Sequence, residues 1–295
     1  MSAGKFIVQT GSVVFLFLSF QFIFFYQNLE AQVLKETLKL AIIPHRSNFG
    51  NEQAYEVVIK LLEQETGVNF QWVGSKTYGD VIEKLRTKQA DIGYVGPFAY
   101  VEAQDDFGVR LICRTLSKHA DEFYHGIIIT RKDAGSANLQ DLKGKSFAFT
   151  DPKSTSGFLF PMARLMNVGI CLADFSEVTY LKRHVNTLLA VYNGHSHAGA
   201  TSTTALNKIN INFDQIKILW KSNPIYRGPW VARKDMPEAL FFKIRAAMLK
   251  ITRHKDAKMI FEGLSTKGFV IGRDADYNNV RDVMAIMRLG TKQSE

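Results

Sequence analysis

After the first thirty residues, the rhythm of hydrophobic and polar positions changes repeatedly along the chain. Short apolar runs, typical of buried strands, alternate with longer segments in which apolar residues recur every three or four positions, as on one face of a helix. In the first part of the chain, this pattern predicts strands at 38–43, 68–74 and 90–96, with helices at 52–67, at 78–89 and from Pro97 onward. This β-α-β-α-β order indicates an open, mostly parallel sheet with right-handed crossovers.

Two consecutive strand-like runs then interrupt the alternation, at 108–116 and 122–131, and they are suited to crossing from one lobe to another. Beyond them the pattern restarts, with strands at 145–150, 177–181 and 197–201 and helices at 157–167 and 185–194. A return strand follows, over 215–220 and 229–233, and three helical segments lie beyond it, from Pro237 onward.

The two sets of elements predict an α/β fold of two similar lobes that form a hinged clamshell. Each lobe is expected to be an open, mostly parallel sheet flanked by helices, and crossing strands join the lobes. Lobe 1 would comprise residues 32–119, completed by about 225–295, and lobe 2 would comprise 120–224. In such hinged folds, ligands bind in the cleft at strand ends and helix N-termini. The site, rather than the fold, must supply the function.

The first thirty residues differ from everything after them. Lys5 precedes an apolar stretch from Phe6 to Tyr26, and the small residue Ala31 follows it. A basic start, an apolar core and a small residue are typical of a secretory signal. The stretch also approaches the roughly 20 residues that span a membrane. Residues 1–31 are therefore predicted to be a signal peptide or an N-terminal membrane anchor, with the rest of the chain in the periplasm, free or held at the inner membrane.

Composition narrows the function classes. With 46% hydrophobic residues in 295, the chain is globular. Its formal net charge is +9, but the basic residues are scattered and do not alternate with aromatics, so we expect no nucleic-acid partner. Cys113 and Cys171 lie in apolar settings and are expected to be small buried residues. GxSxG, Walker and HExxH motifs are absent, and the sequence predicts no enzyme, no metal site and no cofactor.

The stretch "DPKSTSG", residues 151–157, places small or hydroxyl-bearing residues directly before a helical segment. The first N–H groups of a helix have no partner within it and carry partial positive charge, which makes an anion site. Ser154, Thr155 and Ser156 add hydroxyl donors, and Gly157 would let an oxyanion approach the backbone. For this segment alone, an ordinary cap followed by a Ser/Thr-rich turn is the alternative.

Three other strand-to-helix junctions have the same character. Tyr78 begins one predicted helix, Tyr94 and Tyr100 flank the helix start at Pro97, and His184 lies just before another helix. A single tyrosine is most often a core residue with a solvated hydroxyl. Four such junctions in two lobes nevertheless favour a cleft that gathers donors for an anion.

Four blocks of sequence carry a family resemblance: "ADIGYVGPFAYV", "LKGKSFAFTDPKSTSGFLFP", "HVNTLLAVYNG" and "ILWKSNPIYRGPWVARKDMP". In order and spacing, from about Leu38 to about Pro237, the chain resembles the phosphate/phosphite/phosphonate-binding family of periplasmic solute-binding proteins, the receptors of ABC importers. "DPKSTSG" is the most specific block and "YVGPFAYV" comes next. The resemblance implies a type II clamshell that captures a small tetrahedral phosphorus oxyanion (phosphonate, phosphite or phosphate) and delivers it to an ABC transporter permease.

Matching motifs imply a role for each candidate residue. Tyr78 and Tyr100 would supply phenol donors from lobe 1, and His184 would donate from its ring. Residues 154–156, with their amides, would supply lobe 2. Tyr94 and Tyr124 are further candidates that line the cleft.

This chain also departs from the family pattern. Relatives that hold an amino-phosphonate have acidic residues where this chain has Thr204 and Gly228. A buried ammonium without a carboxylate partner is costly, so we expect weak binding of 2-aminoethylphosphonate relative to phosphite, phosphate or phosphonates with small uncharged tails. Val185 and His197 replace aspartates that are common in the family. Arg227, beside the predicted cleft, either supplies a cation there or faces solvent at a turn.

The sequence leaves the output of ligand binding open. A ligand that bridges both lobes favours the closed state by its differential affinity, and closure can signal to a membrane partner. That partner is either an importer permease or a membrane sensor. In the second case the chain would be a membrane-tethered or periplasmic sensory module for a small organic anion.

Overall fold

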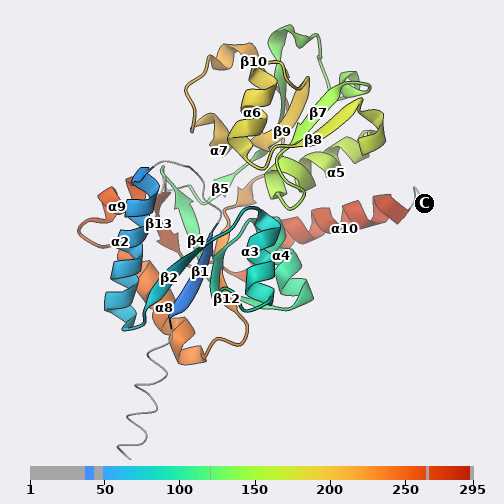
Figure 1. The fold of residues 1–295 in the computed structure, drawn as a ribbon. Coiled ribbons are helices and arrows are strands. Elements are labelled where there is room, and N and C mark those ends of the chain that lie inside the picture. The colour runs from blue at the N-terminus through green and yellow to red at the C-terminus, as the bar shows by residue number, and fades with distance from the viewer. Residues whose placement is uncertain (1–36, 43–48, 120, 264–265, 293–295) are drawn as a thin grey trace, which may run out of the picture.

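The computed structural model describes residues 37–42, 49–119, 121–263 and 266–292, which form two α/β lobes (Figure 1). The leader predicted at 1–31 lies outside the described residues. Among the residues that are described, no helix is both long and apolar enough to cross a membrane.

Lobe 1 is built on a six-stranded sheet in the order β13-β4-β12-β3-β1-β2. Its strands are β1 (Leu38–Ile42), β2 (Phe70–Gly74), β3 (Ile92–Tyr94), β4 (Val109–Ser117), β12 (Pro229–Arg233) and β13 (Thr266–Val270). β1 pairs in parallel with β2 and β3, whereas β12, β4 and β13 run antiparallel to their neighbours.

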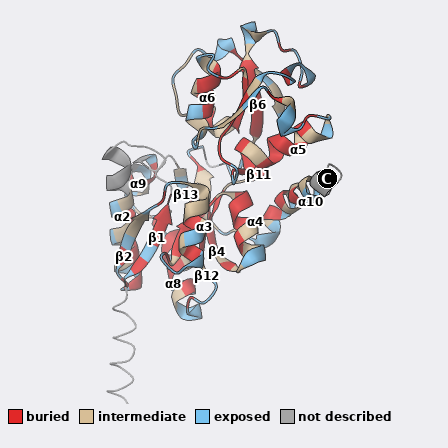
Figure 2. Ribbon diagram, turned by 45° about the vertical axis from the view of Figure 1, so that its right-hand side comes forward, coloured by how far each residue is buried: buried red, intermediate tan, exposed pale blue. Residues whose placement is uncertain are grey.

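Helices cover both faces of this sheet, so its strands are buried (Figure 2). One face carries α2 (Phe49–Thr66), α8 (Glu238–Ile251) and α9 (Ala257–Gly263), and the other carries α3 (Tyr78–Arg86), α4 (Pro97–Asp106) and α10 (Asn278–Lys292). Successive residues of β1 serve the two faces: Leu40 belongs to the first core and Ala41 to the second. This alternation follows from the two-residue period of a strand.

Lobe 2 is built on a five-stranded sheet in the order β10-β6-β9-β7-β8. The strands are β6 (Gly126–Arg131), β7 (Ser146–Phe149), β8 (Glu177–Tyr180), β9 (Ala198–Ser202) and β10 (Ile216–Lys221). β7 is parallel to β8 and β9, while β6 and β10 are antiparallel. α5 (Phe160–Asn167) packs on one face, and α6 (His184–Tyr192) with α7 (Thr203–Leu206) packs on the other.

Two chain crossings join the lobes and pair with each other. β4 leads into lobe 2 through β5 (Phe123–Tyr124), and β10 leads back through β11 (Ile225–Tyr226). β5 and β11 form a two-stranded antiparallel ribbon with Ile225 opposite Tyr124. We call this ribbon, with its flanking residues 117–119, 121–126 and 221–229, the hinge. α10 also contacts both α4 of lobe 1 and α5 of lobe 2.

A buried arginine fixes one side of the hinge to lobe 1. Arg114 on β4 is 5% exposed and forms ion pairs with Glu122 (2.6 Å) and Asp276 (3.1 Å). Its guanidinium carbon lies 4.2 Å from the centroid of the Tyr226 ring. Because a buried charge needs partners, these contacts hold the hinge at the edge of the lobe 1 sheet.

Several details differ from the sequence expectation. Both sheets are mixed rather than mostly parallel, because the strands that flank the crossings enter antiparallel to the βα units. The expected strand at 122–131 divides at His125 into β5 and β6. β13 was not expected, since its five residues, "TKGFV", carry little apolar pattern. Cys113 is buried as expected, but Cys171 is exposed at the start of a short turn.

Candidate functional site

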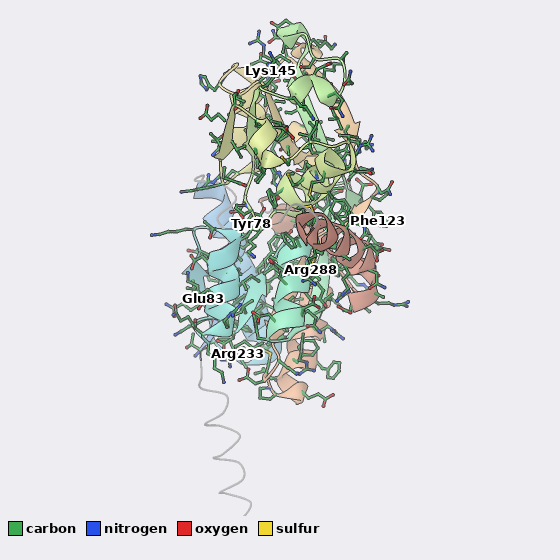
Figure 3. All side chains as sticks on the ribbon, turned by 90° about the vertical axis from the view of Figure 1, so that its right-hand side faces the viewer. Tyr78, Glu83, Phe123, Lys145, Arg233 and Arg288 are labelled. Atoms are coloured by element: carbon green, nitrogen blue, oxygen red, sulfur yellow. The ribbon has the colours of Figure 1, made fainter. Side chains whose placement is uncertain are left out.

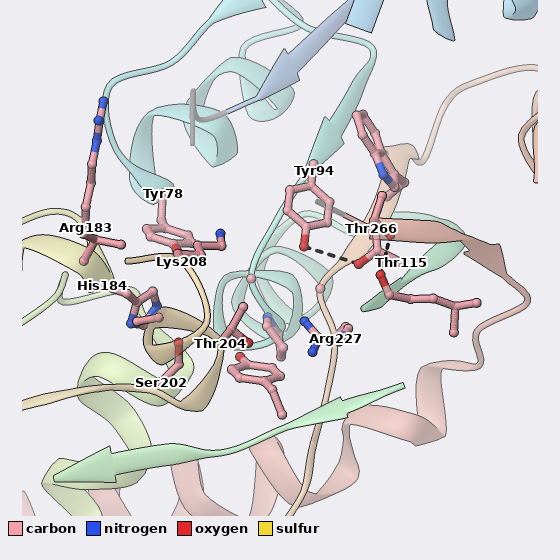
Figure 4. Close-up of a pocket in the computed structure, with 18 of the residues that line it drawn as sticks. Tyr78, Tyr94, Thr115, Arg183, His184, Ser202, Thr204, Lys208, Arg227 and Thr266 are labelled. Atoms are coloured by element: carbon pink, nitrogen blue, oxygen red, sulfur yellow. Dashed lines mark hydrogen bonds between the residues drawn. The ribbon is translucent and has the colours of Figure 1, made fainter. Parts of the chain in front are cut away.

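A cavity of about 290 Å³ lies where the two lobes meet the hinge (Figure 4). Tyr78 and Tyr94 line it from lobe 1, and His184 and Thr204 line it from lobe 2. The hinge contributes residues as well, among them Tyr124 and Arg227. Figure 3 shows Tyr78 at the boundary between the lobes, far from Lys145 at the outer end of lobe 2.

The lining of the cavity is cationic. It includes four basic residues, Lys182, Arg183, Lys208 and Arg227, whereas no Asp or Glu occurs among the described residues that line it. Positive charge in a partly enclosed space concentrates anions there. The cavity is therefore suited to an anionic ligand and offers no counter-ion to an ammonium group.

The "STSG" segment begins the helical part of lobe 2 with an unusual turn. Ser154 is the N-cap, and its Oγ accepts a hydrogen bond from the Gly157 N–H at 3.0 Å. The next residues, Thr155–Leu159, form a π-helical turn (η3) before α5 begins. Such π turns are frequent at functional sites.

Gly157 has a packing role in this turn. A Cβ there would lie 2.4 Å from Oγ1 of Thr150, so only glycine fits. The sequence prediction assigned this glycine to the approach of an oxyanion. In the structure, the Thr150 side chain occupies the space beside Gly157.

Ser154, Thr155 and Ser156 are all buried and are not among the residues that line the cavity. Thr155 reaches across to lobe 1, where its Oγ1 accepts a hydrogen bond from the Phe98 N–H at 2.8 Å. Because this bond uses a lone pair, the Thr155 hydroxyl keeps its own proton for donation. Ser156 Oγ has no protein partner of good hydrogen-bond geometry, so its hydroxyl group remains available to donate.

Tyr124 connects this buried segment to the cavity. Its side chain lies next to the Ser156 and Thr155 hydroxyls, which lower its pKa, but burial has the larger effect and raises the pKa to about 12. Burial also raises the pKa of the Tyr78 phenol well above its usual range, with smaller contributions from Tyr124, Tyr94 and Asp151. Both phenols therefore keep their protons near neutral pH and can donate to an anion.

His184 is the first residue of α6 and is held as a neutral ring. Its Nδ1 lies 3.2 Å from Thr150 Oγ1 and 3.3 Å from Thr201 Oγ1, and its Nε2 lies 3.5 Å from Ser154 Oγ. Burial, followed by the nearby charge of Lys208, lowers its pKa to about 3. An uncharged ring can take part in hydrogen bonds but supplies no positive charge to the cavity.

Tyr100 does not lie in the cavity. Its ring is 1% exposed and packs against Tyr277 at a centroid distance of 4.8 Å, and its hydroxyl donates to Asp274 at 2.8 Å. One turn into α4, the helix is already covered by η6 (Asp274–Tyr277) and α10, and a carboxylate there accepts the hydrogen bond of the phenol. The sequence expectation that Tyr100 supplies a donor to the cleft disagrees with this placement.

Two residues of the hinge, Arg227 and Gly228, line the cavity. Arg227 donates from Nε to the Asp121 carbonyl at 3.1 Å and from Nη2 to the Phe123 carbonyl at 3.3 Å. A Cβ on Gly228 would lie 2.3 Å from the Val95 carbonyl oxygen. This backbone therefore has no room for an acidic side chain at 228.

Some lining residues were not expected from the sequence. Lys208, just beyond α7, and Lys182, whose φ is +65°, belong to no recognisable motif. Thr115 and Trp230 line the lobe 1 end of the cavity from β4 and β12. Only the pairing of distant strands brings these positions together, and no local pattern marks them.

The two mixed sheets, the paired crossings and a cationic cavity at the hinge define a type II periplasmic binding protein. A family model described as "ABC transporter, phosphonate, periplasmic substrate-binding protein" matches residues 40–277, and the chain belongs to this family. Proteins of this family are periplasmic substrate-binding components of transporters rather than enzymes.

Individual relatives agree with this assignment. The chain is 29% identical to the phosphate-import protein PhnD of Mycolicibacterium smegmatis, over 87% of this chain and 88% of that protein. It is 26% identical to the phosphonates-binding periplasmic protein of Escherichia coli, over 86% and 77% of the two chains. In fold it resembles PhnD1 of Prochlorococcus marinus, solved with methylphosphonate, with a TM-score of 0.75 and 20% identity over 85% and 98%.

Proposed function

We propose that this protein captures a small phosphorus oxyanion in the cavity between its lobes and delivers it to the permease of an ABC importer. The observation that carries the proposal is the composition of the cavity: four cations, neutral donors from both lobes, and no acidic residue in the described lining. The names of the relatives, which mention phosphate and phosphonates, support the same ligand class.

The donors fall into an inner and an outer group. Tyr124 and Ser156 form the inner group, where a phenol and a buried serine hydroxyl lie side by side. Tyr78 from lobe 1 and His184 from lobe 2 form the outer group. Ser154 and Thr155 support the inner group, and Tyr94 and Thr204 complete the lining. Donors on both lobes would let a tetrahedral oxyanion bridge them and stabilise the closed state.

The same lining determines which ligand substituents are tolerated. An ammonium group would enter a space with four cations and no carboxylate, and its desolvation would not be offset. We therefore expect 2-aminoethylphosphonate to bind more weakly than methylphosphonate, phosphite or phosphate.

Transport also requires export and a membrane partner. The leader at 1–31 would direct the chain to the periplasm, where closure around the ligand would be recognised by the permease. Sequencing the N-terminus of the mature protein distinguishes a cleaved signal from a retained anchor, and a retained anchor would favour a sensory role.

Isothermal titration calorimetry on the protein without its leader tests the ligand class. Phosphate, phosphite, methylphosphonate, 2-aminoethylphosphonate and sulfate should be compared under the same conditions. The proposal expects saturable binding of at least one of the first three, and weaker binding of the amino compound. Tightest binding of 2-aminoethylphosphonate would refute the specificity, and no binding of any phosphorus oxyanion would refute the function.

A further inference from the structure

Arg227 contributes a cation to the middle of the cavity, where its guanidinium lies near Tyr94 and Thr204 (Figure 4). The residue sits on the hinge between β11 and β12, and its guanidinium carbon is 5.8 Å from the centroid of the Tyr124 ring. A cation at this point adjoins the inner oxyanion donors but comes from a different element.

The hydrogen bonds that Arg227 makes within the protein use only part of its capacity. Nε and Nη2 each donate to a hinge carbonyl, on Asp121 and Phe123, and a guanidinium has five N–H donors in all. No carboxylate of the described residues forms an ion pair with it, although the charge of Asp121 at the hinge acts on it through space. The Arg227 side chain is partly buried, and burial lowers its pKa, whereas Tyr94, Tyr124 and Asp121 have smaller effects in the opposite direction.

A structural role in the hinge explains the two carbonyl contacts but not the remaining charge. Neutral donors would satisfy carbonyl oxygens equally well, and a partly buried cation without a counter-ion is costly. The residues that surround Arg227 on the cavity side are neutral, and the other lining charges are also positive. The missing counter-ion is therefore expected to arrive with the ligand.

The cavity has room for more than a phosphonate group. Its volume of about 290 Å³ lies just below the roughly 300–1,000 Å³ range of small-molecule sites. Figure 4 shows Arg227 between Thr204 and Thr115, both of which also line the cavity. A ligand substituent leaving the phosphorus atom toward Thr115 would pass the guanidinium.

We propose that Arg227 binds a carboxylate on the substituent of the ligand, so that the preferred ligands are phosphonocarboxylates, with the phosphonate on the inner donors. This inference rests on the proposed function, since it assumes that Tyr124 and Ser156 hold the phosphonate. A planar guanidinium matches a carboxylate by paired hydrogen bonds, which makes the contact specific as well as attractive.

The test compares three ligands of nearly equal size by calorimetry: phosphonoacetate, ethylphosphonate and 2-aminoethylphosphonate. Phosphonoacetate should bind at least about tenfold more tightly than ethylphosphonate, the ratio expected for one charge-assisted contact. In Arg227→Met the ratio should fall to within about threefold of unity, and Arg227→Lys should keep an intermediate ratio.

Arg183→Met provides the matched control. Arg183 is an exposed cation on the opposite wall, so its removal takes away the same charge without touching the proposed carboxylate contact. This variant should retain the tenfold ratio. If it lowers the ratio as much as Arg227→Met does, general electrostatic attraction explains the preference and the inference is wrong.

The wild-type comparison stands even if the hinge variants fail to fold. Equal or tighter binding of ethylphosphonate overturns the carboxylate contact while leaving the proposed function intact. If Arg227→Met weakens the binding of phosphonoacetate and of ethylphosphonate equally, Arg227 binds the phosphonate itself or only holds the hinge. This result also overturns the inference. If none of the three ligands binds while phosphate, phosphite or methylphosphonate does, the inference is overturned and the proposed function stands. Only the failure of every phosphorus oxyanion to bind would overturn the function on which the inference rests.

Discussion

Thr155 Oγ1 in lobe 2 accepts a hydrogen bond of 2.8 Å from the backbone N–H of Phe98 in lobe 1. Both groups are buried, and the N–H belongs to the first turn of α4, where no partner exists within the helix. The residue that the sequence singles out as a ligand donor thus also couples the two lobes. If Thr155 also binds the ligand, as proposed, closure and ligand binding depend on the same hydroxyl group.

Replacing Thr155 separates these roles from simple packing. Thr155→Val should weaken ligand binding by about 1–3 kcal/mol, because the Phe98 N–H is left buried without an acceptor when the lobes close. Thr155→Ser restores the hydroxyl and should recover most of the affinity. Calorimetry with methylphosphonate measures both, and an unchanged affinity in a well-folded Val variant would contradict the coupling.

Ser156 offers a second test in which stability and binding should move apart. Its Oγ is buried and has no protein partner of good geometry, so Ser156→Ala removes an unsatisfied group. The midpoint of thermal unfolding without ligand should stay the same or rise. Affinity for methylphosphonate should fall by about tenfold, the effect of one lost hydrogen bond. A fall in stability with no change in affinity would assign the hydroxyl to the fold.

The two tyrosines Tyr100 and Tyr124 should respond in opposite ways to loss of the hydroxyl. Tyr100→Phe breaks the bond to Asp274 and should lower the free energy of unfolding by about 1–3 kcal/mol without affecting ligand affinity. Tyr124→Phe should weaken ligand binding, because its phenol lies beside Thr155 and Ser156. Denaturant unfolding and calorimetry on both variants check this, and a loss of affinity in Tyr100→Phe alone would return Tyr100 to the site.

Tyr100 and Tyr124 show which features of the fold and the site can be predicted from the sequence. Apolar periodicity predicted most strands and helices and the two-lobed arrangement, because it reflects local burial. It could not distinguish Tyr100 from Tyr124, since the carboxylate that accepts the Tyr100 hydrogen bond is 174 positions away. The same limit applies to Lys208, which reaches the cavity only through the packing of lobe 2. β13 escaped prediction because strand β4, rather than its own sequence, stabilises it at the sheet edge.

Thr204 provides a gain-of-function test of the specificity argument. It lines the cavity and is partly exposed, so a longer acidic side chain can be introduced there, whereas Gly228 has no room for one. Thr204→Glu should raise the affinity for 2-aminoethylphosphonate relative to ethylphosphonate by about tenfold, through a charge-assisted contact. Thr204→Gln has nearly the same shape without the charge and should leave the ratio unchanged. No shift in the Glu variant would show that the ligand tail lies elsewhere.

Because the pKa of His184 is lowered in the folded protein, we expect the stability of the protein to depend on pH. Its pKa is about 3 in the folded protein, against an ordinary value of 6.5, so the unfolded chain binds a proton there first as pH falls. The effect of His184 on the free energy of unfolding is therefore most favourable above pH 6.5. As pH falls from 6.5 toward 3, that free energy decreases by up to about 1.4 kcal/mol per pH unit. Unfolding by urea between pH 7 and pH 5 should show a steeper loss for the wild type than for His184→Asn. Equal slopes would mean that the folded protein protonates this ring readily.

The account depends most directly on where a phosphorus oxyanion binds. A crystal structure of the protein without its leader, grown with methylphosphonate, tests this in one measurement. The prediction is a tetrahedral group between the lobes, with its oxygens in hydrogen-bond contact with the hydroxyls of Ser156 and Tyr124. An empty cavity at saturating ligand, or a phosphonate bound away from these two hydroxyls, would contradict it.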